Sequence, residues 1–406
     1  MNMAAPDHDV IIAGGGMVGA SLACALAPRL RVAVVESFPP AAPGVPSYRP
    51  SFDARSTALS LSSVDFFRSI GVWDSIRAHA APIRRIHVSD RGRFGSTTMD
   101  AASEGFDALG YVVENHWLGA VLHAAMHASS GLTLLTPARV DSIAVVPGGA
   151  RLRVSDADGS RELHARLAVI ADGARSALAA SLGISAESRD YGQVALIANI
   201  AHAKPHAWLA FERFCDSGPL AMLPLPDAAD GRARSALVWV LSPADAERRL
   251  ALPERDFLRE LQPAFGYRLG RLLAVGSRAS YPIARVQASE QVRSGVVVLG
   301  NAAHTLHPVA GQGFNLSLRD VAALVETIDA AGARGVSPGE LGVLEGYAEA
   351  RRLDHARTIG FSDMLPRLFG SGWLPLALAR GLGLVGLEML PAARSLLVRQ
   401  ATGLAG

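Results

Sequence analysis

The chain has 406 residues, of which 50% are hydrophobic and 19% are charged, and this composition excludes a disordered chain. At this length we expect two domains, which can be interleaved along the sequence. The 39 basic and 37 acidic residues leave a net charge of +2, so nucleic acid is not expected as the main partner. Cys24 and Cys215 have no metal-ligand spacing and predict free thiols in a reducing cytoplasm. Residues 1–8 do not have the pattern of a signal peptide.

The first predicted elements form a strand–helix–strand unit. A short apolar run at 10–13 predicts a buried strand, a helical run ends before Pro28, and residues 31–35 predict a second strand that Glu36 closes. The turn between the first strand and the helix reads GGGMVG. The fingerprint G-x-G-x-x-G therefore stands in the setting that dinucleotide binding requires, which makes a glycine-rich turn without a ligand the weaker interpretation.

Each fingerprint residue has an expected part in binding. Gly14 makes the tight turn, Gly16 lets a pyrophosphate approach the backbone, and Gly19 lets the helix and the strand pack closely. Glu36 is expected to accept hydrogen bonds from the ribose hydroxyls of an adenosine. The predicted dinucleotide contacts of this unit are Gly14, Gly16, Met17, Val18, Gly19 and Glu36.

A proline-rich loop at 39–50 leads to the next predicted elements. Arg55 stands just ahead of an amphipathic helix, where it can contact a phosphate or a cofactor ring, and a salt bridge to Asp53 or Glu36 is an equal alternative. The elements that follow are predicted by their apolar periodicity. They are strands at 83–88 and 111–113, a helix at 115–128, and a β-meander that begins at 132–135 and returns at 163.

A change of pattern occurs after the buried strand predicted at 167–170, which ends in the sequence ADGARS at 171–176. By itself, Asp172-Gly173 could be only a turn with a helix N-cap.

From 186 to 285 the pattern is typical of an antiparallel sheet inserted between two parts of the nucleotide domain, and such an insertion commonly supplies the roof of a substrate pocket. The predicted strands lie at 194–200, 208–211, 220–224, 236–241 and 281–286, with a mainly helical stretch at 250–273.

The stretch 296–315 reads VVVLGNAAHTLHPVAGQGFN and combines a strand, a loop and a helix start. The apolar run predicts a buried strand, and the helical pattern begins at Asn315. Because helix amides and the macrodipole point into such a loop, we expect a cofactor ring there. His304 and His307 have a spacing that a metal pair could use, but no third ligand is evident. Packing, or a place beside the cofactor, is the favoured interpretation, and no metal is predicted.

The end of the chain, from 346 onward, is predicted to be helical. The segment 374–397 is strongly apolar, but the stretch between Pro375 and Pro391 is shorter and more charged than a bilayer span of about 20 apolar residues. A membrane or partner contact through 372–406 and packing onto the body of the protein are equal alternatives.

We therefore predict an α/β protein with a Rossmann-like domain, an inserted antiparallel-sheet substrate domain and a helical C-terminus. The predicted parts of the Rossmann-like domain are 1–80, 111–185 and 286–345, those of the substrate domain are 81–110 and 186–285, and the C-terminal helical region is 346–406.

Three separated motifs support one resemblance. The chain carries GGGMVG followed by Glu36, ADGARS, and GNAAHTLHPVAGQGFN at 300–315. This combination resembles the single-component flavin-dependent aromatic hydroxylases, the group that includes para-hydroxybenzoate hydroxylase, over nearly the whole chain. FDARSTALS, VVEN at 112–115 and HPVAGQGFNLSLRD are similar to the ubiquinone-biosynthesis hydroxylases in particular. Gly300-Asn301, where most relatives carry Gly-Asp, is similar to the 2-octaprenyl-6-methoxyphenol hydroxylases.

The resemblance implies an FAD-dependent monooxygenase that hydroxylates the ring of a polyprenylated phenol in ubiquinone biosynthesis. NAD(P)H would reduce the flavin, O2 would add to give a C4a-hydroperoxyflavin, and the phenol would attack its distal oxygen. Hydroxylation of another ring position or of a soluble phenol is one alternative, and a non-catalytic flavoprotein subunit of a biosynthetic complex is another. The expected location is the cytoplasm, with the inner membrane face as a site of peripheral contact.

The resemblance also assigns residues to the site. Arg55 would lie by the flavin, and Asp172 and Gly173 would serve both FAD and the reduced nicotinamide. Asn301 can accept hydrogen bonds from the ribityl hydroxyls through its carbonyl oxygen, without the charge of an aspartate. No base that deprotonates the phenol stands out. The residues expected near the ring are His304, Pro308, Gly311, Gln312, Gly313, Phe314 and Asn315.

Overall fold

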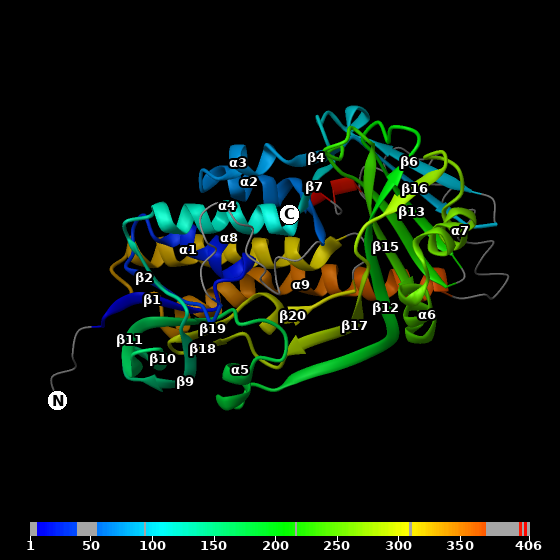
Figure 1. Cartoon of the computed structure of the whole chain (residues 1–406). Coiled ribbons are helices and arrows are strands. Elements are labelled where there is room, and N and C mark those ends of the chain that lie inside the picture. The colour runs from blue at the N-terminus through cyan, green and yellow to red at the C-terminus, as the bar shows by residue number, and fades with distance from the viewer. Residues whose placement is uncertain are drawn as a thin grey trace.

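The strand–helix–strand unit at the start of the chain belongs to a largely parallel sheet (Figure 1). The computed structural model describes residues 6–38, 55–92, 95–215, 217–307, 311–370, 398–399 and 402–403. Within these residues the sheet has eight strands, and its main path runs β18–β19–β11–β1–β2–β8. These strands are β1 (His8–Ala13), β2 (Val32–Val35), β8 (Leu132–Leu135), β11 (Gly159–Ile170), β18 (Val292–Arg293) and β19 (Val296–Val298).

The central strands are apolar at successive positions because both faces of this sheet are buried. In β1, Val10 and Ile12 face one core, and Ile11 and Ala13 face the other. The helices α1 (Met17–Leu26), α4 (Asn115–Ala128) and α8 (Gln312–Gly332) contribute to the first core. The second core lies under β9 (Arg139–Val146), β10 (Gly149–Asp156) and α5 (Ala177–Ser181).

The β-meander of this region differs from the predicted one. The prediction that residues 132–135 begin the meander is wrong, because β8 pairs in parallel with β2. The meander consists of β9, β10 and the first half of β11, which are antiparallel. The second half of β11 continues without a break between β1 and β19. One strand therefore belongs to both the meander and the parallel sheet.

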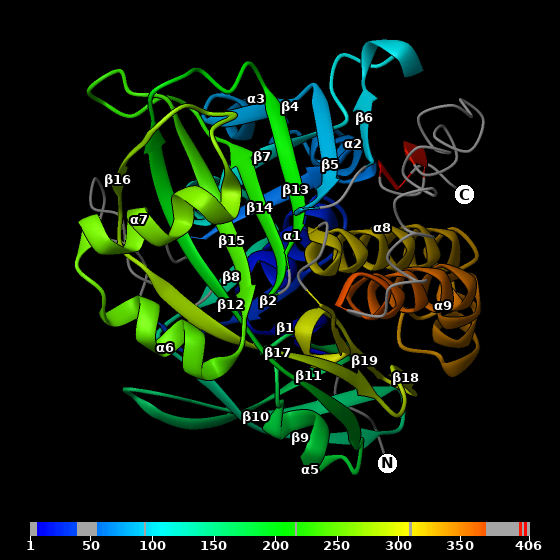
Figure 2. The same cartoon turned by 90° about the vertical axis from the view of Figure 1, so that its right-hand side faces the viewer.

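A second, nine-stranded sheet contains most of the strands predicted between 186 and 285. Within the described ranges its main path runs β20–β17–β12–β15–β14–β13–β5–β6, and β16 pairs with β12. Neighbouring strands are antiparallel except β13 and β5, which are parallel. The helices α6 (Pro243–Ala251) and α7 (Glu254–Phe265) lie beside this sheet (Figure 2). The strands are β5 (Arg85–Asp90), β6 (Ser96–Asp100), β12 (Ala186–His202), β13 (Leu209–Cys215), β14 (Gly218–Pro224), β15 (Arg234–Leu241), β16 (Leu272–Val275), β17 (Ala279–Ala288) and β20 (His304–Thr305).

Two parts of this sheet were predicted differently. β12 begins at Ala186 rather than at 194, since its first half pairs with β17 and is mostly exposed, which hides the alternation of a half-buried strand. Residues 272–275 form β16 instead of the end of a helical stretch. The α/β class, the Rossmann-like unit and the inserted sheet are confirmed.

A small third sheet and two long helices complete the described structure. The third sheet has the order β3–β7–β4, and the short helices α2 and α3 lie between β3 and β4 along the chain. α8 and α9 (Leu341–Gly370) run side by side (Figures 1 and 2). The remaining elements are β3 (Ser56–Ser60), α2 (Leu61–Ser69), α3 (Trp73–Arg77), β4 (Ala80–Ile83), β7 (Gly110–Glu114) and two 3₁₀ turns at Ala102–Glu104 and Gly300–Ala302.

Most of the segment 372–406 lies outside the described residues. Of the residues that are described there, Val398 and Thr402 are each only 1% exposed. This part of the segment therefore packs onto the body of the protein, while a membrane or partner contact stays a prediction. No helix in the described ranges is long and apolar enough to cross a membrane.

Candidate active site

The fingerprint turn leaves no room for side chains at two glycines. Gly14 has a φ of +107°, and a Cβ there would lie 2.4 Å from the carbonyl oxygen of Ala171. A Cβ on Gly19 would lie 2.0 Å from the carbonyl oxygen of Gly14. Gly16 is the N-cap of α1, so the first free amides of that helix open at the turn. The turn has the shape that a pyrophosphate-binding loop requires.

The carboxylate of Glu36 is fixed at the end of β2. Its Oε2 accepts a hydrogen bond from the backbone N–H of Gly15 at 2.7 Å, and its Oε1 accepts one from Phe38 at 2.9 Å. Glu36 is buried, with 7% exposed. A carboxylate has about four acceptor positions, so two remain for the hydroxyls of a ribose.

The helix α8 begins at Gln312, three positions before the predicted start at Asn315. Gly311 caps it in the left-handed region, with a φ of 62°. Asn315 is therefore inside the first turn, and its side chain is fully used. Its Oδ1 accepts from the Ser60 amide at 2.8 Å and the Ser63 hydroxyl at 2.7 Å, and its Nδ2 donates at 2.8 Å to the carbonyl oxygens of Ala58 and Gly311. Asn315 therefore joins α8 to β3 and α2.

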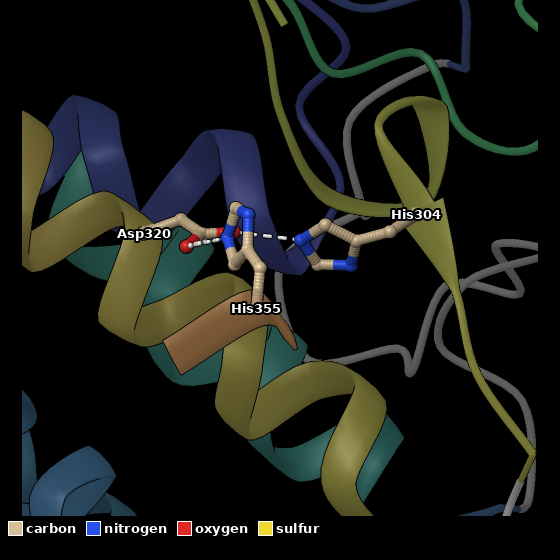
Figure 3. A group of neighbouring side chains, drawn as sticks. All are labelled: His304, Asp320 and His355. Carbon is tan, nitrogen blue, oxygen red and sulfur yellow. Dashed lines mark hydrogen bonds and ion pairs between the residues drawn. The ribbon is translucent and has the colours of Figure 1, made fainter. Parts of the chain in front are cut away.

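A buried carboxylate anchors the start of the loop that precedes α8. Asp320 on α8 is 1% exposed and lies 2.6 Å from His304 Nε2 and 2.7 Å from His355 Nε2 (Figure 3). The Nε of Arg351 also donates to it, at 2.7 Å. Burial alone would raise the pKa of Asp320, but hydrogen bonds and charge from His304 and His355 hold it well below the usual range.

The same group has the composition of a metal site, since His304, Asp320 and His355 bring three ligand atoms close together. Arg351 argues against that use, because its guanidinium already binds the carboxylate and would repel a cation. The nitrogen–oxygen distances are also those of hydrogen bonds. We therefore interpret the group as a network that joins β20, α8 and α9. His307, the other member of the predicted pair, packs edge-on against Tyr191 instead.

A cavity of about 1360 Å³ connects the fingerprint turn, the loop before α8 and the nine-stranded sheet. Many of the predicted cofactor residues line it. They are Gly16, Met17, Val18, Arg55, Gly173, Asn301, Gly311, Gln312, Gly313, Phe314 and Asn315. Pro308 lies outside the described residues.

The other predicted residues lie away from the cavity lining. Gly14, Gly19 and Glu36 shape the turn behind it. Asp172 is exposed, and its Oδ2 accepts from the Ser176 hydroxyl at 2.9 Å. Ser176 is in turn the N-cap of α5. His304 faces Asp320 rather than the cavity, so the structure does not bring it to the place expected for a ring neighbour.

The sheet side of the cavity is apolar, with aromatic and aliphatic side chains from β5, β13, β14, β15 and β17. At its edge, the Arg55 guanidinium stacks 4.5 Å from the centre of the Tyr281 ring. His307 lines the cavity, and burial lowers its pKa to about 4 against the opposing charge of Asp363. His307 is therefore neutral at pH 7. The chamber suits a large, mainly apolar ligand held against a polar cofactor cradle.

Comparison with known proteins assigns the chain to a family. The FAD binding domain family matches residues 7–361. Ubiquinone hydroxylase UbiL of Rhodospirillum rubrum is 37% identical over 396 residues, which cover 97% of this chain and 89% of that protein. The 3-demethoxyubiquinol 3-hydroxylase of Escherichia coli is 31% identical over 398 residues, with 98% of each chain covered. The chain belongs to the FAD-dependent monooxygenases of this family.

A solved structure supports the fold of the monooxygenase. The crystal structure of p-nitrophenol 4-monooxygenase PnpA from Pseudomonas putida superposes with a TM-score of 0.75 at 18% identity, over 97% of this chain and 98% of that one. The two related hydroxylases named above confirm the resemblance to ubiquinone-biosynthesis hydroxylases that was inferred from the motifs. The site fits FAD, because backbone contacts at Gly14 and Gly19 close the fingerprint turn tightly, the free amides of α1 open beside Gly16, and the cavity continues from that turn.

Sequence reasoning missed several residues of the site. Asp320 and His355 were not connected with His304, because only the packing of α8 against α9 brings them together. Val398 and Thr402 line the cavity, although their segment was predicted only to contact a membrane or partner or to pack onto the body of the protein. Glu212 also lines the cavity. Its position between apolar residues two places away on either side, Ala210 and Phe214, was the signal that could have found it.

Proposed function

We propose that the monooxygenase hydroxylates the aromatic ring of a polyprenylated phenol, a precursor of ubiquinone, with O2 and with NAD(P)H as electron donor. The observation that carries this proposal is the single cavity that runs from the FAD cradle to the apolar wall of the nine-stranded sheet. When bound, FAD supplies the oxygen-transfer chemistry, with the C4a-hydroperoxyflavin expected from the sequence resemblance. The names of the related hydroxylases support the choice of substrate.

The chain's own residues would position the reactants and keep water away. The first amides of α8, next to Gly311, direct the positive end of the helix dipole into the cavity, where it would stabilise negative charge on a reduced flavin. Arg55, held over Tyr281, adds a second positive group at the rim. The apolar wall would receive the ring and the first part of the prenyl chain.

The substrate can be identified by precursor analysis. Cells in which the gene is deleted should accumulate a prenylated phenol that lacks one ring hydroxyl. Mass spectrometry of that compound would identify the ring position that the protein hydroxylates. The purified protein should also oxidise NADH or NADPH faster when that phenol is added. Bound FAD without any phenol-stimulated oxidation would instead favour a non-catalytic flavoprotein subunit.

A long-chain phenol must be drawn from a membrane or from a lipid-binding partner. We propose that the protein makes peripheral membrane contact, with part of 372–406 as the contacting segment. The burial of Val398 and Thr402 restricts that contact to other residues of the segment. Flotation of the full chain with anionic lipid vesicles, compared with neutral vesicles, tests this, and a protein that floats with neither contradicts it.

A further inference from the structure

Glu212 places a carboxyl group on the apolar wall of the cavity. It lies on β13 between Ala210 and Phe214, and all three line the cavity. The alternate residues of the strand serve the opposite face. Arg213 donates a hydrogen bond to the carbonyl oxygen of Phe265 at 2.6 Å, and the ring of Phe211, which also touches the cavity, packs edge-on against that of Phe265. The direction of the Glu212 side chain therefore follows from the pleat of the strand.

The strand registers place Glu212 within a row of side chains that crosses the sheet. Its direct neighbours are Val88 on β5 and Ala221 on β14. Every member of the row lines the cavity, and Glu212 is its one charged residue. In order across the sheet, the row is Thr97, Val88, Glu212, Ala221, Val238, Ile197 and Ala279.

No protein group in the described part of the chain compensates the carboxylate of Glu212. No hydrogen bond or ion pair joins it to another residue, and burial raises its pKa to about 7 without a contribution from a nearby charge. The facing residues on β5 and β14, Val88 and Ala221, carry no charge. The other titratable side chains that line the cavity, among the described residues, are Arg55, Tyr281 and His307.

An unpartnered carboxyl group in an apolar chamber is costly to bury, and proteins rarely keep one without a use. A ring hydroxyl is the polar group that the proposed substrate would bring into this chamber. We propose that Glu212 binds this hydroxyl by accepting its hydrogen bond, and so sets the orientation of the ring on the chamber wall. This inference rests on the phenol substrate proposed above.

Binding measurements on the FAD-loaded full chain can test the inference. The probes are an ortho-prenylated phenol and its methyl ether, in which a methyl group replaces the hydroxyl proton and removes the hydrogen-bond donor. Their dissociation constants can be read from the change in flavin absorbance. We expect the wild type to bind the phenol about tenfold more tightly than the ether at pH 8, as for a charge-assisted hydrogen bond.

The pH dependence has a definite sign. The ionised carboxylate is the better acceptor, so the preference for the phenol should rise as the pH increases through about 7, the pKa of Glu212. A phenol itself ionises only near pH 10 and does not contribute below pH 8. Glu212→Gln, which keeps the shape of the side chain, should show a smaller preference that does not vary with pH. Glu212→Leu should bind the phenol and the ether about equally.

The control variant is Glu247→Gln, a charge change on the exposed face of α6, which should keep the wild-type preference and its pH dependence. FAD content reports that each variant is folded. If Glu212→Gln and Glu212→Leu both kept the wild-type preference for the phenol over the ether, the role of Glu212 would be overturned. The proposed phenol substrate would be unaffected by that result. A wild type that holds FAD but binds neither aromatic probe would overturn the phenol substrate, and the inference with it.

Discussion

At the residue scale, the shape of the fingerprint turn depends on two glycines, Gly14 and Gly19, that have no side chain. The missing Cβ atoms of Gly14 and Gly19 allow contacts with carbonyl oxygens that a side chain would block. These contacts are with backbone, which cannot move aside as a flexible side chain can. The turn therefore tolerates no other residue at these two positions.

Gly19→Ala tests this directly. The new Cβ would meet the carbonyl oxygen of Gly14 at 2.0 Å, so we expect the purified variant to lose most of its bound FAD, as measured by flavin absorbance per protein. Gly346→Ala is the matched control, because its Cβ would meet nothing within 4 Å on α9. That control should keep FAD and gain about 0.5–1 kcal/mol in stability. Normal FAD content in Gly19→Ala would contradict the contact.

Asn301 is exposed at the cavity, next to Gly300 in its left-handed conformation. We expect Asn301→Asp to keep FAD and much of the activity, because either side chain can accept hydrogen bonds from ribityl hydroxyls. FAD stoichiometry and NAD(P)H oxidation measure both effects. Complete loss of flavin would show that the loop holds the cofactor in another way.

At the scale of elements, α8 connects the parts of the site. Asn315 in its first turn is bonded to β3 and α2, and Asp320, further along, is bonded to β20 and α9. The loop between β20 and α8 is thus held at both of its ends. The buried carboxylate of Asp320 has hydrogen-bond partners in His304, His355 and Arg351, and a buried acceptor with that many partners favours one arrangement of the elements that carry them.

Asp320→Asn removes the charge that His304, His355 and Arg351 share. We expect the free energy of unfolding to fall by about 3–5 kcal/mol at pH 7, as when one partner of a buried charge network is removed. Asp329→Asn is the control, since the ion pair of Asp329 with Arg29 is exposed and is worth less than about 1 kcal/mol. Urea unfolding measures both, and equal losses in the two variants would contradict the network.

The difference in free energy of unfolding between the wild type and Asp320→Asn should depend on pH, because the pKa of Asp320 is lowered. Its stabilisation is complete above the pKa of an unfolded aspartate, about 3.9. As the pH falls below that value, this aspartate becomes protonated in the unfolded chain while Asp320 in the folded protein stays ionised. The unfolded state is therefore favoured by protonation, and the stabilisation is lost. The gap between wild type and Asp320→Asn should therefore shrink between pH 5 and pH 3.

At the scale of the whole molecule, the site lies between two sheets of different kind. The parallel sheet and α8 supply the cofactor side, and the nine-stranded sheet supplies the chamber wall (Figure 2). We therefore expect cofactor binding and substrate binding to be carried by separate elements. A change confined to the chamber wall should alter substrate size preference without affecting the flavin.

Ala221→Phe is such a change, since Ala221 lines the cavity beside Glu212. The added ring would occupy chamber space, so we expect unchanged FAD content and at least about tenfold weaker binding of a prenylated phenol, or about 1.4 kcal/mol. Ala168→Phe provides the contrast, because Ala168 is fully buried in β11. It should destabilise the fold by about 1–3 kcal/mol. Loss of FAD in Ala221→Phe would contradict the separation.

The features that could be predicted from sequence are those set by local chain chemistry. GGGMVG and Glu36 identified the turn, and the apolar periodicity of residues 115–128 located α4 with its observed bounds. Features that depend on distant pairing could not be predicted in this way. What Glu212 faces depends on the register of β13 against β5, whose residues lie far earlier in the chain. His304 likewise finds Asp320 and His355 only after α8 and α9 pack.

The order of strands in the parallel sheet has a consequence for synthesis of the protein on the ribosome. β1 can pair with β2 early, but its other neighbour is β11, which is synthesised much later. β11 in turn pairs with β19, which is synthesised later still. Ala171 packs against the turn at Gly14. The cavity wall that faces this turn is completed only when α8 has been synthesised. Pairings so distant in sequence form slowly, and the apolar strands stay unprotected meanwhile. Loading of FAD is thus a late event, and a nascent fragment that carries the fingerprint is not yet a cofactor-binding module.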